Sequence, residues 1–477
     1  MMEPLEPLDL SRCHTVGDIV NAMSRCSFGA RMLGEVAATL TGWVDHGEKP
    51  YCVYDGLGDT PLGLLLRAMV SNGWFRSILT PAEYDSLKCA ETTTIVVVGP
   101  YPERYSKAVE HRAHDGIYIN ASEQSPMHFI KDGYFRNVIF ADPRFILPVL
   151  DAVLEERLKG QGLMVREFFA DLPLYGGTAF RVAEGAQTLQ AMVADPRCTV
   201  FLTLSGAMTI AKMGLVVCDM IDHGMVQYIA STGALMAHGL VESIGRKHYK
   251  HRPEHDDALL AEQKLNRVTD TLEPEENLDE VSRVLDLILD QINGGNPIST
   301  HELHQRIGAY LIEECPAERA ILASAARRNV PVVVPAFVDS ELGNDVFVHN
   351  RRRLAEGRQR VVINPELDSE LLVQMMLDGD RLGIFSIGGG VPRNNTQNGA
   401  PLIEITSDRL GLNWPMKKFA YGCRISPDAP YYGHLSGCTY DENKSWRKME
   451  TTGRFTEIRA DATQVWPFLV KYVMETL

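Results

Sequence analysis

Two residues near the carboxyl end of the chain, Trp446 and Lys448, have types and a spacing that could do chemistry. They lie in the segment SGCTYDENKSWRKM, whose other residues are mostly small, polar or charged. A strand edge would place both side chains on one face with the lysine tip in water, as most lysines are. A buried lysine is the alternative, because burial lowers the pKa from about 10.4 and leaves a neutral amine that can act as a nucleophile. Burial of Lys448 decides between the two interpretations.

The elements that must position this lysine follow an α/β pattern. Apolar, strand-like runs alternate with longer segments of helical period, such as residues 178–193 and 277–292. This alternation predicts an α/β fold with a doubly wound, largely parallel sheet that helices cover on both faces. The predicted strands lie in Thr92–Gly99, Cys198–Gly206, Met225–Gly233, Val330–Asp339 and Leu382–Gly390.

Several of these runs end in small residues. The small residues are Ser205 and Gly206, then Ser231, Thr232 and Gly233, and finally Gly388, Gly389 and Gly390. Ligands of open α/β sheets bind at the carboxyl ends of the strands, where backbone amides near helix N-termini suit a phosphate. No G-x-G-x-x-G follows the first strand, so an ordinary Rossmann dehydrogenase is not supported.

Composition excludes several classes of protein. The 477 residues carry a formal net charge of −15, which disfavours a nucleic-acid partner and slightly favours cationic ligands such as amines. No apolar run approaches the roughly 20 residues that span a bilayer, so no membrane partner is expected. The 9 cysteines show neither zinc-type nor redox-type pairing, and the first residues do not resemble a signal peptide. We therefore expect a cytoplasmic protein.

An internal repeat divides the chain. Three pairs of segments match in the same order, namely Gly34–Asp45 with Ala183–Asp195, Arg67–Ile78 with Cys218–Ile229, and Glu110–Asp115 with Lys250–Asp256. The matches predict that residues 10–155 are a shortened, diverged copy of residues 165–292. The expected domains are a non-catalytic α/β domain at 1–158 and a catalytic domain at 159–477. Two unrelated α/β pieces that share helix periodicity are the alternative.

From about Asp171 to Leu477 the chain resembles the deoxyhypusine synthase family, in its bacterial deoxyhypusine synthase-like and homospermidine synthase-like branch. The landmarks, in order, are FLTLSGAM, STGA, LNRVTDTLEPEENLDEV, DSELG, GGG, SGCTYDENKSWRK and RADATQVWPFLV. The resemblance implies a doubly wound α/β fold, NAD as the cofactor, and a homo-oligomer, dimer or tetramer, with active sites at dimer interfaces.

The resemblance also implies a redox-neutral transfer of an aminoalkyl group. In the family, NAD takes a hydride from the carbon beside a secondary amine, and an active-site lysine captures the aminobutyl fragment as a Schiff base. An acceptor amine then displaces the lysine, and the stored hydride reduces the new imine. Lys448 falls on the nucleophile position, and Trp446 would supply an apolar wall and a π face for a cation. Arg447 stands where the family has glycine, so its guanidinium would either favour the neutral amine or crowd the site.

Further positions carry over one by one. Ser436 and Glu442 match substrate-contacting positions, and Glu442 could hold an ammonium group. Asp339 could bind a ribose hydroxyl, although a helix N-cap before SELGND is an equal alternative. The implied cofactor-binding residues are Ser205, Gly206, Thr232, Gly233, Asp339, Gly388, Gly389, Gly390 and Asp461.

The chain also departs from the family pattern. His238 stands where the family has a glutamate near the nicotinamide, and it is either a replacement acid or base or a buried structural histidine. Asn344 stands at a substrate-binding aspartate, which the adjacent Asp345 could replace. Arg393 and Asn394 replace a lysine–histidine pair whose histidine shuttles protons in the family.

Tyr432 and Leu435 replace two further acidic residues. With fewer carboxylates, the site predicts a donor amine that is smaller than spermidine or differently charged, and a small-molecule acceptor as in homospermidine formation. A deoxyhypusine synthase that modifies a protein lysine and a non-catalytic amine-binding member are the alternatives. An ordinary dehydrogenase or a deacetylase-like enzyme is a further NAD-using class.

Two histidine-containing motifs complete the candidates. HYKHRPEHDD, residues 248–257, has a spacing that could bind a metal, but a polar loop with a proline is usually only solvated. HELH, His301 to His304, opens a predicted helix capped by Ser299 or Thr300 and lacks the H-E-x-x-H spacing of zinc proteases. We therefore predict no metal site.

Overall fold

The computed structural model describes residues 2–54, 56, 58–86, 94–98, 116–120, 137–252 and 255–477. The chain forms two compact units: unit 1 comprises Met1–Leu10, Gly185–Ala462 and Leu477, and unit 2 comprises Ser11–Glu184 and Thr463–Thr476. The domain boundary that we expected after residue 158, on the basis of the internal repeat, lies inside unit 2. It falls at the end of α7 (Pro143–Lys159). Among the described residues, none of the helices is long and apolar enough to cross a membrane.

Unit 1 is built on a six-stranded sheet in the order β12-β7-β6-β14-β15-β16. Every neighbouring pair is parallel, which confirms the predicted largely parallel sheet. The strands are β6 (Cys198–Leu204), β7 (Tyr228–Ser231), β12 (Val332–Val333), β14 (Arg381–Ile387), β15 (Phe419–Ile425) and β16 (Met449–Ile458).

Helices cover both faces of this sheet, as a doubly wound fold requires. Leu382 and Ile384 of β14 pack in one buried cluster with residues of α17 (Pro365–Asp378) and α18 (Gly390–Leu410). Gly383 lies between them and faces the other way, where a Cβ atom would come within 2.5 Å of Met192 of α9 (Gly177–Ala194). The strands therefore read as continuous apolar runs because both of their faces are buried.

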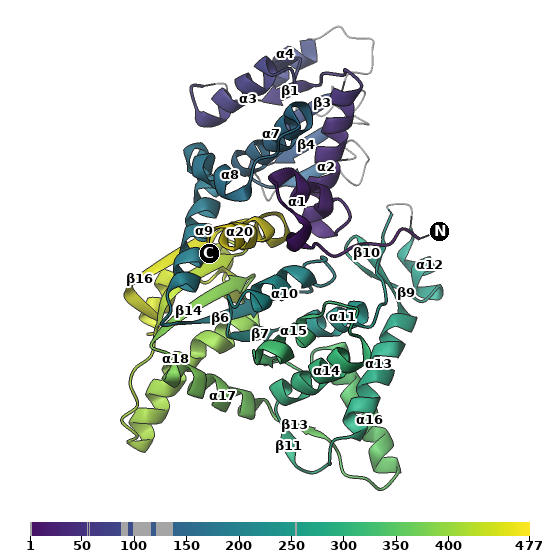
Figure 1. Cartoon of the computed structure of the whole chain (residues 1–477), viewed down its shortest axis with the longest axis vertical. Helices are drawn as coiled ribbons and strands as arrows, with labels where there is room; N and C mark the ends of the chain where they lie inside the picture. The colour runs from purple at the N-terminus through teal and green to yellow at the C-terminus, as the bar shows by residue number, and fades with distance from the viewer. Residues whose placement is uncertain are drawn as a thin grey trace. The chain divides into compact units, whose positions relative to one another are not determined.

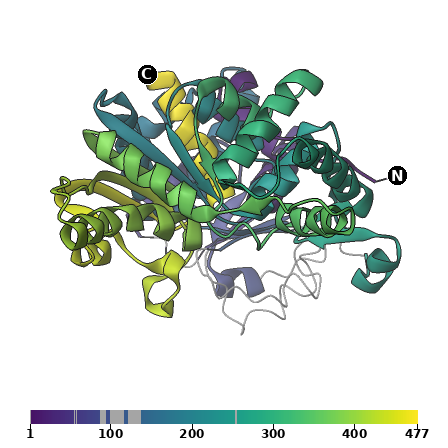
Figure 2. The same cartoon turned by 90° about the horizontal axis from the view of Figure 1, so that it is seen from below.

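The remaining elements of unit 1 connect the strands or extend the sheet edge (Figure 1). Two small sheets, β8-β10-β9 and β11-β13, lie in the long connection between β7 and β14. The β9–β10 hairpin and α12 lie at the opposite end of the unit from α18 and β16 (Figures 1 and 2). The helices are α10 (Gly214–Asp222), α11 (Gly233–Ser243), α12 (Asp257–Glu262), α13 (Glu275–Asp290), α14 (Thr300–Glu314), α15 (Ile321–Arg328), α16 (Glu341–Ala355) and α19 (Tyr440–Ser445); the small strands are β8 (Tyr249–Lys250), β9 (Leu265–Val268), β10 (Thr271–Pro274), β11 (Pro297–Ile298) and β13 (Val362–Ile363).

Unit 2 contains a five-stranded parallel sheet in the order β2-β1-β3-β4-β5. Its core includes Val53, Ile95, Val97 and Tyr118 from neighbouring strands. The strands are β1 (Tyr51–Tyr54), β2 (Ser77–Leu79), β3 (Ile95–Val98), β4 (Ile117–Asn120) and β5 (Asn137–Phe140); the helices include α1 (Val16–Met23), α2 (Phe28–Asp45), α3 (Pro61–Ser71), α4 (Pro81–Ser86), α7, α8 (Val165–Asp171) and α20 (Ala462–Thr476).

The two sheets share one strand order. In chain order, the strands of unit 2 run 2-1-3-4-5, and so do β7-β6-β14-β15-β16 of unit 1. Two of the three sequence matches fall on equivalent elements, α2 with α9 and the α3–β2 pair with the α10–β7 pair. The third match involves Glu110–Asp115, which lies outside the described residues.

The structure differs from the expected end of the copied region at residue 292. Unit 2 also has strands at the positions of β14, β15 and β16, which come after residue 292 in the chain. Strand order persists after sequence similarity has been lost, since it depends only on which segments are apolar and how the connections cross. Among the described strands, the resemblance of the two units therefore covers five of the six strands of the unit 1 sheet, all but β12.

Candidate functional site

A cavity of about 420 Å³ lies at the carboxyl ends of the strands of unit 1, and we call it the strand-end pocket. Residues at the ends of β6, β7, β14 and β15 line it. The small residues after β6, β7 and β14 are the ones that we expected at the strand ends. The lining residues are Ser205, Gly206, Ser231, Thr232, Gly233, Ala336, Asp339, Gly388, Gly389, Gly390, Val391, Pro392, Ser426, Pro427, Asp428 and Ser436.

The three consecutive glycines are required by backbone geometry. Gly388 has a φ of +76° and Gly390 a φ of +65°, a region that residues with a side chain rarely adopt. At Gly389 a Cβ atom would lie 2.4 Å from the Cα of Ser436. The turn from β14 into α18 therefore exposes bare backbone to the pocket.

Two helices begin at this pocket with their first amide groups uncapped. Neither Thr232, which precedes α11, nor Gly389, which precedes α18, provides a side-chain cap. The Thr232 hydroxyl instead donates to the carbonyl of Gly206 at 2.6 Å, and the Ser205 hydroxyl donates to the carbonyl of Gly389. Free helix N-termini and close backbone approach fit the phosphates of a dinucleotide. The residues present therefore fit NAD.

Asp339 lines the same pocket. The alternative role for Asp339 was that of a helix N-cap, and its neighbour Ser340 has that role. The N-cap of α16 is Ser340, whose hydroxyl accepts a hydrogen bond from the amide of Gly343 at 3.1 Å. The carboxylate of Asp339 is therefore not used to cap the helix, and as a pocket residue it can accept hydrogen bonds from a ligand.

A second cavity, of about 310 Å³, surrounds Lys448, and we call it the lysine pocket. It adjoins the strand-end pocket, because neighbouring residues of α18, Pro392 and Arg393, line one pocket each. The lining residues are Arg393, Asn394, Gln397, Asn398, Leu435, Cys438, Glu442, Asn443, Trp446 and Lys448.

Lys448 is buried, with 5% of its surface exposed, which rules out the solvated strand edge. It lies just before β16, and its amide donates to the carbonyl of Asn443 at 3.1 Å. Its Nζ donates to Oδ1 of Asn394 at 3.0 Å and lies 5.8 Å from the centre of the Trp446 ring. Burial lowers the pKa of Lys448, and the guanidinium of Arg393 acts in the same direction.

The arginine that affects Lys448 is Arg393 and not the adjacent Arg447. Arg447 is exposed and pairs with Glu404 of α18, so it neither crowds the pocket nor lines it. Its φ of +59° explains why a glycine suits this position. Arg393 is 2% exposed, and its side chain donates to neutral groups, Oε1 of Gln397 and the carbonyl of Cys438.

Of the sequence-predicted substrate residues, Trp446, Glu442, Arg393 and Asn394 surround Lys448, whereas Ser436 lines the adjoining strand-end pocket. Of the predicted cofactor residues, all but Asp461 line the strand-end pocket. Asp461 lies after β16 and lines neither pocket.

Asn344, Asp345 and His238 also lie outside both pockets. Asn344 and Asp345 belong to α16, and burial raises the pKa of Asp345 to about 6, helped by nearby Asp286. Within one chain the structure therefore gives these three residues no place beside Lys448.

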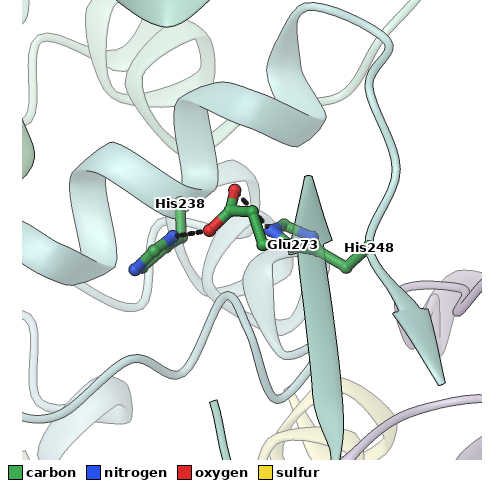
Figure 3. A group of neighbouring side chains, drawn as sticks. All are labelled: His238, His248 and Glu273. Atoms are coloured by element: carbon green, nitrogen blue, oxygen red, sulfur yellow. Dashed lines mark hydrogen bonds and ion pairs between the residues drawn. The ribbon is translucent and has the colours of Figure 1, made fainter. Parts of the chain in front are cut away.

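His238 belongs to a buried chain of charged groups (Figure 3). Its Nδ1 lies 2.6 Å from Oε2 of Glu273, and Oε1 of Glu273 lies 3.1 Å from Nε2 of His248. Although burial lowers the pKa of His238, contact with Glu273 outweighs it and raises the net pKa. The same contacts hold the pKa of Glu273 down at about 2 against the effect of burial.

His238, His248 and Glu273 bring their ligand atoms within 4.8 Å of one another, as a metal site would. However, Nζ of Lys212 lies 2.8 Å from Nδ1 of His248. An ammonium group only donates, so Nδ1 accepts and Nε2 carries the hydrogen that points to Glu273. His248 then has no lone pair for a metal ion, and hydrogen bonds and ion pairs account for the group.

Sequence reasoning missed several lining residues. Gln397 and Asn398 lie one turn after Arg393 and Asn394 on α18, and helical spacing could have found them. Ser426 and Asp428 come after β15, so the strand-end rule would have found them had the run Phe419–Ile425 been recognised as a strand. Cys438 carried no signal.

Comparison with known proteins gives one consistent result. The family model described as deoxyhypusine synthase matches residues 168–473. "Probable deoxyhypusine synthase 2" of Methanosarcina acetivorans is 32% identical over 295 residues, covering 62% of this chain and 82% of the relative. "Probable deoxyhypusine synthase 1" of Archaeoglobus fulgidus is 31% identical over 318 residues, covering 66% and 95%. "Deoxyhypusine synthase-like protein" of Chlorobaculum tepidum is 32% identical over 296 residues, covering 62% and 81%.

Proposed function

The chain belongs to the deoxyhypusine synthase family, whose members are NAD-dependent aminobutyl transferases, and from this premise we propose that it transfers an aminoalkyl group between small amines, as in homospermidine formation. The observation that carries the proposal is the burial of Lys448 in a pocket that adjoins the strand-end pocket, whose residues fit a dinucleotide. A deoxyhypusine synthase that modifies a protein lysine is the alternative, and the choice of acceptor distinguishes the two.

In this proposal, the strand-end pocket holds NAD, which when bound accepts the hydride of the donor amine and later returns it. The uncapped amides of α11 and α18 bind phosphate, and Asp339 accepts hydrogen bonds from a ribose. The backbone of Gly389 packs against Ser436, another residue of the pocket, with no room for a Cβ atom.

Lys448 is the nucleophile. Burial and Arg393 favour its neutral form, which can attack the imine carbon of the oxidised donor. The bond from this carbon to the donor nitrogen then breaks, the rest of the donor leaves as an amine, and the aminoalkyl fragment stays on Lys448 as a Schiff base. Asn394 positions Nζ through a hydrogen bond of 3.0 Å. The amide of Asn394 cannot shuttle a proton, so the proton that leaves Nζ has to be taken up by another group, such as the substrate amine, water or the carboxylate of Glu442 in the same pocket.

The charges around Lys448 favour a small donor. Glu442 is the one carboxylate among the residues that line the lysine pocket, and Arg393 adds a buried positive charge. One carboxylate can hold one ammonium group by a charge-assisted hydrogen bond, whereas a long tricationic amine would need more. A diamine, or an amine that also carries a negative group, suits this balance better than spermidine.

A second copy of the chain is part of the proposal. Exposed apolar side chains surround both pockets: Val338 next to Asp339 is 85% exposed, and Trp446 in the lysine pocket is 63% exposed. A homo-oligomer would cover these side chains and could bring groups such as Asn344 and Asp345 of one copy near the lysine pocket of another. A monomer in light scattering at micromolar concentration would contradict this part.

The experiment incubates the whole protein with NAD and a panel of diamines and polyamines. With donor alone we expect NADH absorbance and, after borohydride, a covalent aminoalkyl adduct on Lys448 by mass spectrometry. With a second amine we expect a new secondary amine and no net NADH. Transfer only to a protein lysine would replace the small-acceptor proposal, and NAD binding with no adduct for any amine would contradict transfer altogether.

A further inference from the structure

The HELH motif, which the proposed function does not use, opens onto a separate cavity. His301, His304 and Gln305 of α14 line a space of about 120 Å³ between α14, α15 and β12. The opposite wall is mostly apolar, with Leu322, Ala325, Ala326, Asn329, Val330 and Val332. Two imidazole rings and two carboxamides thus share one small cavity.

His304 has one ring nitrogen engaged and the other without a partner. The side chain is 1% exposed, and its Nδ1 lies 3.1 Å from the carbonyl of Val332. A carbonyl only accepts, so Nδ1 carries the hydrogen and Nε2 carries a lone pair. No described residue gives a hydrogen bond to this buried Nε2.

His301 repeats the pattern one turn earlier on the same face of α14. Its Nδ1 is also buried, and no described residue is hydrogen-bonded to it. Residues three apart on a helix are neighbours, and both rings line the same cavity. Buried nitrogens without partners are costly, which points to a group that completes them.

The start of α14 is held rigidly in place. Oδ1 of Asp368 accepts from the amide of His301 at 3.0 Å, and Oδ2 accepts from the amide and hydroxyl of Thr300 at 3.0 and 2.7 Å. The Ser299 hydroxyl caps the helix by accepting from the amide of Glu302 at 2.8 Å, as the sequence indicated. The backbone that carries both imidazoles is therefore held in place before any ligand arrives.

Two of the buried histidine groups of unit 1, the one around Glu273 and the one in α14, differ in their lone pairs. In the first group, Lys212 and Glu273 engage both nitrogens of His248. In the second, a backbone carbonyl holds the Nδ1 hydrogen of His304 and leaves Nε2 available. A ring N–H donated to a backbone carbonyl is the usual support of a metal-bound histidine.

We propose that His301 and His304 bind a divalent transition-metal ion of the kind that prefers imidazole, such as Zn²⁺ or Ni²⁺, through Nδ1 of His301 and Nε2 of His304. Carboxamide oxygens of Gln305 or Asn329, which line the cavity, and water complete the coordination. The ion clamps the first turn of α14 against α15.

The test is calorimetric titration of the whole protein, stripped of metals by a chelator, with Zn²⁺ and separately with Ni²⁺. We expect one ion bound per chain at micromolar or tighter affinity, and a higher melting temperature with the ion. His301→Ala should weaken binding at least tenfold. His304→Leu should do the same, and if this buried substitution prevents folding, the half-buried His301→Ala decides alone.

Two control variants distinguish the competing sites. The rings of His251 and His255 meet edge to face, 5.2 Å apart, and could hold an adventitious ion. If the ion binds in α14, the double variant H251A/H255A should bind it as the wild type does. His248→Gln tests the buried group of His238, His248 and Glu273, and this variant should also bind the ion as the wild type does. Binding that disappears in either control but survives in His301→Ala overturns the proposal, and so does a titration without heat, as expected of a cavity that holds only water.

Discussion

Units 1 and 2 share the 2-1-3-4-5 order of parallel strands, yet they differ in the connections between the strands. In unit 1 the chain between β7 and β14 runs from residue 232 to residue 380 and contributes Asp339 and α11 to the strand-end pocket. In unit 2 the corresponding connection, from β2 to β3, spans only residues 80–94. The family match begins at residue 168, so most of unit 2 lies outside it.

The difference teaches that the sheet by itself does not make the site. A parallel sheet directs its strand ends to one edge, but pocket walls come from the connections and the residues at their turns. Unit 2 has the same frame and lacks the long connection. Substitutions in the pockets of unit 1 should therefore change transfer and NAD binding, whereas substitutions in unit 2 should change stability alone.

The largest effect is expected at the nucleophile of unit 1. Lys448→Ala should lower transfer by about 10³-fold or more and abolish the borohydride adduct, because no other group replaces a Schiff-base amine. The matched control is Lys444→Ala in α19, whose exposed Nζ pairs with Asp441. Transfer that survives Lys448→Ala would remove the chemical distinction between the units.

Two glycine substitutions, one in each unit, test whether the strand-end pocket binds NAD. Gly389→Ala would place a Cβ 2.4 Å from the Ser436 backbone and should weaken NAD binding by about tenfold to a hundredfold in fluorescence titration, or about 1.4–2.7 kcal/mol. Gly42→Ala in α2 of unit 2 meets nothing within 4 Å and should stabilise the protein slightly, by roughly 0.5–1 kcal/mol. Equal NAD affinity in both variants would contradict the proposal that NAD binds in the strand-end pocket.

Acid should act on the two units in opposite directions. The folded pKa of Glu273 in unit 1 is about 2, so its stabilising contribution is present above about 4.5 and is lost as the pH falls from there to about 2. Burial raises the folded pKa of Asp151 in unit 2 to about 6, with Glu155 contributing, so stability there is lost as the pH rises from about 4 to 6.

Two variants isolate these pH effects at pH 7. Asp151→Asn should stabilise unit 2 by about 1–2 kcal/mol, because it removes a buried charge. Glu273→Gln should destabilise unit 1, because it removes the carboxylate whose contacts with His238 and His248 hold its own pKa at about 2. Hydrogen exchange read separately over β1–β5 and over β6–β16 measures both, and shifts of the same sign would refute the contrast.

The smallest effect concerns the backbone beside Lys448. Arg447→Gly should stabilise unit 1 by up to about 1 kcal/mol, since φ = +59° costs glycine little, and should leave transfer near the wild-type rate. Arg447→Ala keeps the strained conformation and loses only the exposed pair with Glu404, which separates the two causes. A large loss of transfer in either variant would place Arg447 in the site after all.

Much of the strand-end pocket could be predicted from local sequence. Small residues directly after apolar runs identified Ser205, Thr232 and Gly389, because parallel strands bring their carboxyl ends to one edge whatever the rest of the chain does. Less of the lysine pocket could be predicted from the sequence. Arg447 directly precedes Lys448 in the sequence, whereas Arg393 lies in a distant segment. Only the side-chain directions show that Arg393 is the arginine that acts on Lys448.

The order of apolar and helical segments determined the doubly wound sheet of this protein, because burial of a strand on both faces demands a continuous apolar run. Tertiary structure alone decided that Lys448 is buried, that Ser340 rather than Asp339 caps α16, and that His304 keeps a free lone pair while His248 does not. Each of these depends on which atom of a distant segment comes within about 3 Å, the reach of a hydrogen bond, and no local pattern encodes that.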